Sequence, residues 1–178
     1  MEGLDLASSA GCREPYRLEA TGPRRFRVTV IDCGVKRGIL QELQERGCEL
    51  RVLPADADPA DWLAEGPDGL FVSNGPGDPA AVERAQEAIL GFSNRGTPVF
   101  GICLGHQLIA RAFGGQTYKL PFGHHGGNHP VRNLDSGTVE ITAQNHGFAV
   151  VEDDQGRVPG APGFRVTHRN LYDGTVEG

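Results

Sequence analysis

Short β-branched runs and segments with helical spacing alternate along the first two thirds of the chain. The run Phe26–Asp32 is typical of a strand, and the apolar residues between Ile39 and Leu43 predict a helix that ends at Gly47. The pattern then repeats along the chain. It predicts strands at residues 49–53, 69–73 and 98–102, a short helix from Asp58 through Leu63, and helices over residues 80–94 and 104–112.

This alternation predicts an α/β fold with a mostly parallel sheet flanked by helices, whose ligands gather at the carboxyl ends of the strands. After Gly114 the pattern changes to short strands, at residues 117–120, 138–143, 148–151 and 164–167. We expect a smaller antiparallel or mixed extension there. Residues 1–25 have little periodicity and resemble a linker or the end of a missing N-terminal domain, so we assign the main domain to residues 26–178.

Composition narrows the classes of partner. The chain has 178 residues and a net charge of -6. A chain without a basic surplus is poorly suited to nucleic acid or to an anionic membrane surface, which favours a small polar substrate or another protein. The four cysteines lack zinc-site spacing and are expected to be thiols in a reducing compartment. With no apolar leader or membrane-spanning run, we expect a cytoplasmic protein.

The most informative segment is Gly101–Gln107, with the sequence GICLGHQ. It places Cys103 at a glycine-flanked turn between a predicted strand and a predicted helix. In such an elbow the glycines allow strained backbone and close approach, and the helix N-terminus favours a thiolate. The alternative is a small buried cysteine in an ordinary turn between strand and helix, and spacing alone does not separate the two.

A second glycine-rich loop, Ser73–Pro79, follows the strand predicted at residues 69–73. It lacks the lysine and hydroxyl of a nucleotide-binding P-loop, which leaves two interpretations. One is a proline-stiffened turn in which Asp78 caps the next helix. In the other, its backbone amides help to hold an oxyanion while the N–H of Leu104 supplies a second donor. The fold should bring this loop and Cys103 to one crevice.

Three histidines, His124, His125 and His129, lie close together in a glycine-rich segment and invite a metal interpretation. Adjacent histidines project differently and the segment has no H-E-x-x-H spacing, so we expect no metal and interpret it as a rigid loop. Residues 144–148 could form a plain hairpin turn or could offer amide and backbone groups to a polar ligand. His168 is expected to be a structural residue at a strand end.

Together these motifs resemble the class I, triad-type glutamine amidotransferases. Residues Gly101–Gln107 resemble the nucleophile segment of that family, and Ser73–Pro79 resembles its oxyanion-side loop. Within the family the resemblance narrows to the small, glutamine-hydrolysing subunit of carbamoyl phosphate synthase. The segments that carry this narrower resemblance are residues 3–7, 32–37, 122–130 and 141–150, so nearly the whole chain is covered.

The resemblance implies a flavodoxin-like sheet and a Cys103 thiolate that attacks the side-chain amide of glutamine to form a glutamyl thioester. Ammonia then passes to the large synthetase subunit, the expected partner, and no cofactor is expected in this chain because ATP and metal belong to that subunit. Carried over by the motifs, the glutamine-binding residues are Gly75, Gly77, Leu104, Gln107, Asn145, Gly147 and Phe148.

One feature departs from the family. Its members complete the triad with a histidine and a glutamate in an H-x-E segment, and this sequence contains no H-x-E or H-x-D. The chain is therefore expected to be truncated at its C-terminus and nearly inactive by itself. Two alternatives stay open. One is a non-catalytic binding or scaffold module, and the other is an unrelated cysteine hydrolase that uses His146 or His168.

Overall fold

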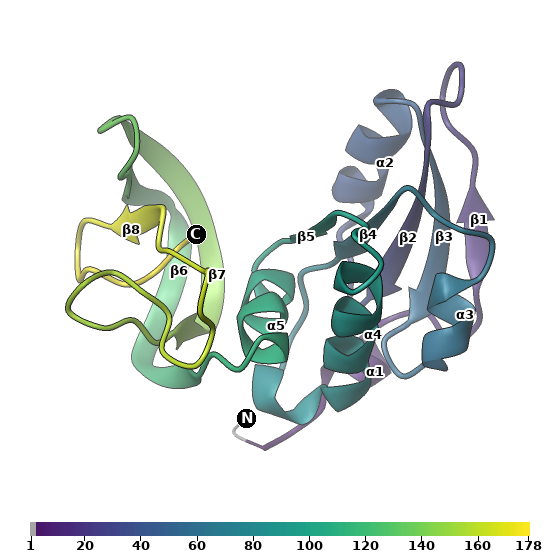
Figure 1. The fold of residues 1–178 in the computed structure, drawn as a ribbon. Helices are drawn as coiled ribbons and strands as arrows, with labels where there is room; N and C mark the ends of the chain where they lie inside the picture. The colour runs from purple at the N-terminus through teal and green to yellow at the C-terminus, as the bar shows by residue number, and fades with distance from the viewer. Residues whose placement is uncertain (1–2) are drawn as a thin grey trace. The chain divides into compact units, whose positions relative to one another are not determined.

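The computed structural model describes residues 3–178, which fall into two compact units with a boundary between Ala112 and Phe113 (Figure 1). The first unit contains the predicted alternation of strands and helices, and the second contains the predicted change to strands alone. Within the described residues, every helix is too short or too polar to cross a membrane.

The first unit is built on a five-stranded sheet with the order β1-β3-β2-β4-β5. Strands β2 to β5 are parallel to their neighbours, whereas β1 at the edge is antiparallel to β3. The order of the parallel strands is that of a flavodoxin-like sheet, and the chain reverses its direction of growth between β2 and β4. The strands are β1 (Tyr16–Leu18), β2 (Phe26–Asp32), β3 (Cys48–Pro54), β4 (Gly69–Val72) and β5 (Val99–Gly101).

Helices cover both faces of this sheet. Leu40 of α2 packs on the face that carries Val30 and Val52, and the carbonyl of Trp62 in α3 accepts a hydrogen bond from Thr29 on the opposite face. Helices α3, α4 and α5 contact one another in sequence order. The helices are α1 (Ala7–Ala10), α2 (Arg37–Glu45), α3 (Pro59–Leu63), η1 (Pro79–Ala81), α4 (Glu83–Ser93) and α5 (Leu104–Ala112).

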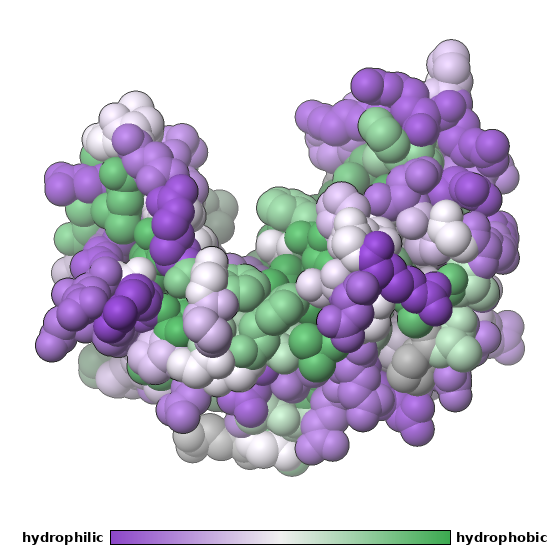
Figure 2. Space-filling view, viewed as in Figure 1, coloured by the Kyte–Doolittle hydropathy of each residue, from purple (hydrophilic) through white to green (hydrophobic). Residues whose placement is uncertain are grey.

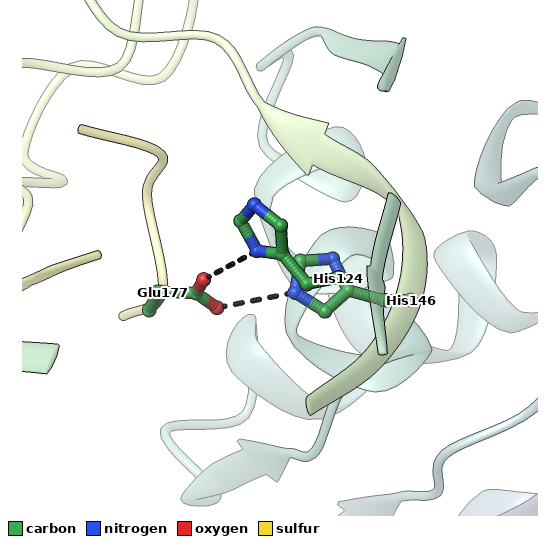
Figure 3. Close-up of side chains that lie close together, drawn as sticks. All are labelled: His124, His146 and Glu177. Carbon is green, nitrogen blue, oxygen red and sulfur yellow. Dashed lines mark hydrogen bonds and ion pairs between the residues drawn. The ribbon is translucent and has the colours of Figure 1, made fainter. Parts of the chain in front are cut away.

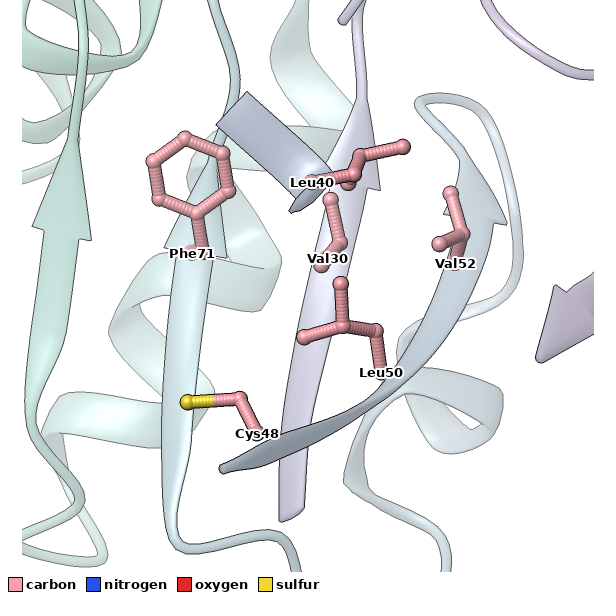
Figure 4. Packing of buried hydrophobic residues seen from close by; sticks show 6 residues of the cluster. All are labelled: Val30, Leu40, Cys48, Leu50, Val52 and Phe71. Atoms are coloured by element: carbon pink, nitrogen blue, oxygen red, sulfur yellow. The ribbon is translucent and has the colours of Figure 1, made fainter. Parts of the chain in front are cut away.

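Helix α2 illustrates why the hydrophobic pattern of the first unit predicts its secondary structure. Leu40 faces the sheet, where it joins buried side chains from three strands, among them Leu50 and Phe71 (Figure 4). The opposite side of α2 carries exposed charged residues such as Arg37 and Glu42, and hydrophilic side chains gather over this helix in Figure 2. An amphipathic helix of this kind is held by burial of its apolar stripe.

Two predictions for the first unit need correction. The helix expected over residues 80–94 is interrupted, because η1 is a separate 3-10 turn and Val82, with φ -99° and ψ 67°, lies outside the helical region before α4 begins. Part of the segment that we interpreted as a linker is structured, since β1 pairs with β3 over three residues. A strand of three residues is too short to show periodicity, which explains why the sequence pattern missed it.

The second unit is a three-stranded antiparallel sheet with the order β7-β6-β8, formed by β6 (Thr117–Asn133), β7 (Val139–Val150) and β8 (His168–Asn170). This confirms the antiparallel extension, but the short strands predicted at residues 117–151 were wrong because they merge into two long ones. The rigid loop expected around His124, His125 and His129 is wrong as well, because β6 continues through it with register shifts between Lys119 and His124 and between Gly126 and His129. Residues 164–167 make only an isolated bridge through Arg165 rather than the predicted strand.

Candidate active site and a buried histidine cluster

Cys103 lies between the end of β5 and the start of α5, at the turn that the sequence predicted. Its φ is 55°, so it adopts the left-handed conformation that side chains with a Cβ seldom occupy. Such a backbone costs on the order of 1–3 kcal/mol and persists only where its surroundings hold it. The residue is partly exposed rather than buried in the core. Both observations favour the nucleophile interpretation over the buried-cysteine alternative.

The two glycines that flank Cys103 allow this turn to form. A Cβ atom built on Gly105 would lie 2.1 Å from the carbonyl oxygen of Val72, and one on Gly101 would lie 2.4 Å from the carbonyl carbon of Gly105. Real Cβ atoms do not approach backbone so closely. The chain therefore needs glycine on both sides to bring the start of α5 against the end of β4.

The Ser73–Pro79 loop begins next to the turn that contains Cys103. The N–H of Ile102 donates to the carbonyl of Val72 at 3.1 Å, and the Cβ site of Gly105 lies 3.1 Å from the carbonyl oxygen of Ser73. The predicted meeting of the two glycine-rich segments at one sheet edge is confirmed within the first unit. Both lie at the carboxyl ends of parallel strands, as in other open α/β sheets.

The loop is also packed against the turn that follows β2. A Cβ on Gly75 would lie 2.1 Å from the carbonyl oxygen of Cys33, whose N–H donates to the Ser73 hydroxyl at 2.9 Å. The Asp32 carboxylate fixes the same turn by accepting the N–H groups of Gly34 and Val35 at 2.9 and 2.8 Å. A glycine approached this closely presents its backbone rather than a side chain.

Further along the loop, the interpretation as a helix-capping turn is also confirmed. The Asp78 side chain accepts the N–H of Ala80 at 2.8 Å and thereby caps η1. Gly77 has φ 102°, and its Cβ site lies 3.0 Å from the carbonyl oxygen of Leu4. The loop is thus both a capped turn and a glycine-rich backbone surface, so the two interpretations do not exclude each other.

The remaining predicted residues of the first unit lie on α5. Leu104 is buried and is the first residue of the helix, so its N–H belongs to the helix N-terminus, where backbone donors favour negative charge. Gln107 is buried, and its N–H donates to the carbonyl of Cys103 at 3.2 Å. The first unit therefore packs the start of the Ser73–Pro79 loop and the start of α5, which follows Cys103, at one edge of the sheet.

The other cysteines have different surroundings. Burial, with a contribution from the Asp32 charge, raises the pKa of the Cys33 thiol to about 12 and that of Cys12 to about 11. Burial also raises the pKa of Cys48. All four cysteines are reduced thiols. Because the thiolate is the reactive form, Cys12, Cys33 and Cys48 are poor nucleophiles near neutral pH.

Asn145, Gly147 and Phe148 belong to the second unit, on β7. The hairpin-turn interpretation of residues 144–148 was wrong, because this segment lies inside a long strand whose register pairs Asn145 with His125. Asn145 is exposed and its Oδ1 lies 2.8 Å from Nδ1 of His125, while Phe148 is buried. Their assignment to a glutamine pocket stays a prediction.

The structure also reveals a buried group that the sequence analysis missed, which we call the histidine cluster: His124, His146 and Glu177 (Figure 3). His124 Nδ1 lies 3.1 Å from Glu177 Oε1, and His146 Nε2 lies 3.3 Å from Glu177 Oε2. The three side chains are only 7 to 9% exposed. The pairing of β6 with β7 sets His124 opposite His146, a juxtaposition that no local motif encodes.

The cluster is strongly ionic. Burial lowers the pKa of the His146 imidazole, but the Glu177 carboxylate and the Phe148 carbonyl outweigh it and raise the pKa above its ordinary value. Burial likewise raises the pKa of Glu177, yet His146, Asn170 and His124 leave it below its ordinary value. A buried carboxylate held between two imidazoles thus favours positive charge on its neighbours.

Comparison with known proteins agrees with the geometry of the first unit. The family model described as "Glutamine amidotransferase class-I" matches residues 29–178. Carbamoyl phosphate synthase small chains from Halomonas eurihalina and Escherichia coli K12 are 48% and 53% identical to the whole chain, and each is covered over 49% of its length. The chain therefore spans about half the length of the curated relatives it matches.

Solved structures with lower identity share the fold. A putative GMP synthase component from Thermoplasma acidophilum aligns with a TM-score of 0.67 at 20% identity, over 84% of this chain and 75% of that one. A glutamine amido transferase from Methylobacillus flagellatus aligns with a TM-score of 0.61 at 19% identity, over 84% of this chain and 63% of that one. At these identities the likeness concerns the fold alone.

Proposed function

Because this chain belongs to the class I glutamine amidotransferase family, we propose that the full-length protein hydrolyses the side-chain amide of glutamine through a thioester on Cys103. The observation that carries the proposal is the left-handed backbone of Cys103 between two glycines that leave no room for a Cβ. Stored strain at a partly exposed cysteine is typical of a catalytic nucleophile and unnecessary in a scaffold module.

The chemistry follows from this arrangement. The Cys103 thiolate attacks the amide carbon of glutamine, and the carbonyl oxygen takes up the negative charge of the tetrahedral intermediate. Backbone N–H groups of Gly75 and Leu104 stabilise that oxygen, a role that requires close backbone approach and no side chain. The carbon–nitrogen bond then breaks, and ammonia leaves with an added proton. Water cleaves the thioester to release glutamate and restore the thiol.

Proton transfer in these steps needs a general base. The family resemblance places it in an H-x-E segment, which this sequence does not contain. We therefore assign the base to the full-length protein rather than to a histidine of this chain. Glutamine itself is proposed to contact Gly77 and Gln107, and the assignment of Asn145, Gly147 and Phe148 to glutamine binding rests on the family resemblance alone.

A second protein is proposed to consume the ammonia. The curated relatives are named small chains of carbamoyl phosphate synthase, so the partner is expected to be the large chain, which would use ATP and metal. The acidic composition supports a protein partner over nucleic acid or membrane. The reduced thiols support a cytoplasmic location.

The proposal is tested by replacing Cys103 with serine in the full-length protein, co-purified with its synthetase partner, and measuring glutamate release from glutamine. We expect the rate to fall by ~10³-fold or more, because a nucleophile and its base act as a unit. The matched control is Cys12→Ser, which changes another partly exposed thiol. Ammonia-dependent synthesis of carbamoyl phosphate should survive in both variants.

Two outcomes would overturn the assignment. Glutamine hydrolysis that persists in the Cys103→Ser protein would exclude this nucleophile. A full-length protein that binds glutamine and its partner but hydrolyses no glutamine would instead support the scaffold module.

A further inference from the structure

The histidine cluster has a feature that its hydrogen bonds do not explain. His146 Nε2 is 3.3 Å from a Glu177 oxygen but lacks hydrogen-bonding geometry toward it, and it has no hydrogen-bond partner among the described residues. The His146 side chain is nine-tenths buried. Buried polar nitrogens in native proteins are normally hydrogen-bonded, so His146 Nε2, held only by the ion pair with Glu177, is available to a ligand.

In each of the two rings, the hydrogen bond made by the nitrogen that does not face Glu177 shows that this nitrogen carries a proton. His146 Nδ1 is 2.8 Å from the carbonyl oxygen of Phe148, which can only accept, so Nδ1 carries a proton. His124 Nε2 is 2.7 Å from a carboxylate oxygen of Asp173, so the same holds there. A neutral ring has only one N–H. In their neutral form both rings therefore turn a lone pair toward the negatively charged Glu177 carboxylate, where a bound cation would stabilise all three groups.

We propose that His124 Nδ1, His146 Nε2 and the Glu177 carboxylate bind one divalent transition-metal ion, with Zn²⁺ as the best fit. Two imidazoles and one carboxylate form a known zinc ligand set that leaves the fourth position to water. Neighbouring ligands of a tetrahedral ion with bonds of about 2.0–2.1 Å lie roughly 3.3 Å apart. His124 Nδ1 lies 3.1 Å from one carboxylate oxygen of Glu177 and His146 Nε2 lies 3.3 Å from the other, and one ligand atom from each of the three residues lies within 4.8 Å of the others.

The surroundings of the cluster are those of a built metal site. Histidine ligands of metals usually donate their other N–H to a carboxylate or a backbone carbonyl, which Asp173 and Phe148 provide here. Asn170, which is buried, donates from Nδ2 to Glu177 Oε1 at 3.0 Å and so orients the carboxylate. The backbone N–H of Glu177 donates to the carbonyl of His168 at 3.0 Å, which holds the residue in place.

This proposal differs from the metal interpretation that the sequence suggested and that we set aside. Of the three neighbouring histidines, only His124 contributes a ligand. His125 is exposed and faces Asn145, and the His129 ring lies beside that of His124 in a tilted arrangement. The second histidine and the glutamate come from β7 and from the segment after β8. A sequence search for closely spaced ligands could not find such a site.

The ion would act by cross-linking the second unit. It would join β6, β7 and the segment after β8 in a unit whose interior contains few large apolar side chains. Metal-binding free energy then contributes directly to folding. The proposal is independent of the proposed glutamine hydrolysis, and its test reads metal binding rather than turnover.

The test uses full-length protein stripped of metal by chelation and returned to metal-free buffer. Zn²⁺ is titrated by calorimetry, and Co²⁺ is added separately because a tetrahedral site gives it visible absorption. We expect binding to saturate at one ion per chain. Glu177→Gln should weaken Zn²⁺ binding more than ~100-fold, and Asp173→Asn should weaken it by about 10–100-fold through its effect on His124.

His125→Ala is the matched control, since it removes a neighbouring histidine outside the cluster and should leave the affinity unchanged. Equal binding by wild type and Glu177→Gln would overturn the proposal, because the ion would then lie elsewhere, for example on thiols. Absence of saturable binding would also overturn it and would mean that two imidazolium protons supply the positive charge. If Glu177→Gln fails to fold, unaltered affinity in Asp173→Asn is the contradicting result.

Discussion

The two units of the chain hold their functional residues in opposite ways. In the first, Cys103 and its neighbours are positioned by backbone contacts over an apolar core, and all of the largest fully buried side chains among the described residues belong to this unit. In the second, side-chain contacts among His124, Asn170 and Glu177 join segments far apart in the sequence.

This difference decides how much can be predicted from the sequence. Burial of apolar side chains produces a periodic hydrophobic pattern, so the strands and helices of the first unit can be predicted before its structure is known. A buried polar network leaves no period, because its members meet only after strand pairing has set their register. The first unit is expected to tolerate exchange among apolar side chains of similar volume. The second is expected to respond to loss of single polar groups.

The largest expected effect concerns the backbone of the elbow. Gly105→Ala would place a Cβ 2.1 Å from the carbonyl oxygen of Val72, which forces α5 away from β4. We expect glutamine hydrolysis by the full-length protein to fall by ~10²-fold or more, since a displacement of about 1 Å has this effect on reacting groups. The free energy of unfolding should fall by about 1–3 kcal/mol.

Gly38→Ala is the control for this substitution. Gly38 lies in α2 with no atom within 4 Å of its Cβ site, and alanine should stabilise the helix by about 0.5–1 kcal/mol. Normal hydrolysis by the Gly105→Ala protein would show that backbone approach does not position the nucleophile.

The next prediction compares how much unfolding free energy one interior substitution costs in each unit. Phe92→Ala opens a cavity in the apolar core of the first unit and should lower its free energy of unfolding by about 3–5 kcal/mol. Asn170→Ala removes a donor to Glu177 and an acceptor for the N–H of Tyr172, and should cost the second unit about 1–3 kcal/mol. Native-state hydrogen exchange measures each unit separately. A negligible effect of Asn170→Ala would contradict a polar network that holds the second unit.

The smallest effect is a pH dependence of labelling. Because the pKa of Cys12 is raised to about 11, its thiol keeps its proton at pH 8, and the thiolate fraction grows about tenfold per pH unit. Iodoacetamide labelling of Cys12, followed by peptide mass spectrometry, should still be rising at about pH 10. The Cys33 thiol, with a pKa of about 12 and full burial, should label more slowly still. A plateau for Cys12 near pH 9 would show an ordinary thiol.

The sequence predicted the first unit well for physical reasons. The strand Phe26–Asp32 was predicted to the residue, and the glycine-rich segments around Ser73 and Cys103 were placed at one sheet edge because parallel strands end together. The break at Val82 was missed because the apolar spacing continues across it. The strand β1 was missed because three residues give no measurable period.

For the second unit, the sequence predicted only that an antiparallel or mixed sheet would form. The glycine-rich segment around His124 and His129 was interpreted as a rigid loop, whereas two register shifts keep β6 continuous through it. The cluster of His124, His146 and Glu177 depends on which residues face each other across two strands, and on a glutamate 31 positions beyond His146 along the chain. A single sequence carries no local record of either fact.

The central claim is that Cys103 carries the glutamyl group, and acid quenching tests it most directly. Full-length protein is mixed with glutamine, quenched within the first turnovers and digested for mass spectrometry. The account predicts a glutamyl group on the peptide that contains Cys103, with Cys12, Cys33 and Cys48 unmodified. Release of ammonia with an adduct on another cysteine, or with no adduct at any stage of turnover, would contradict it.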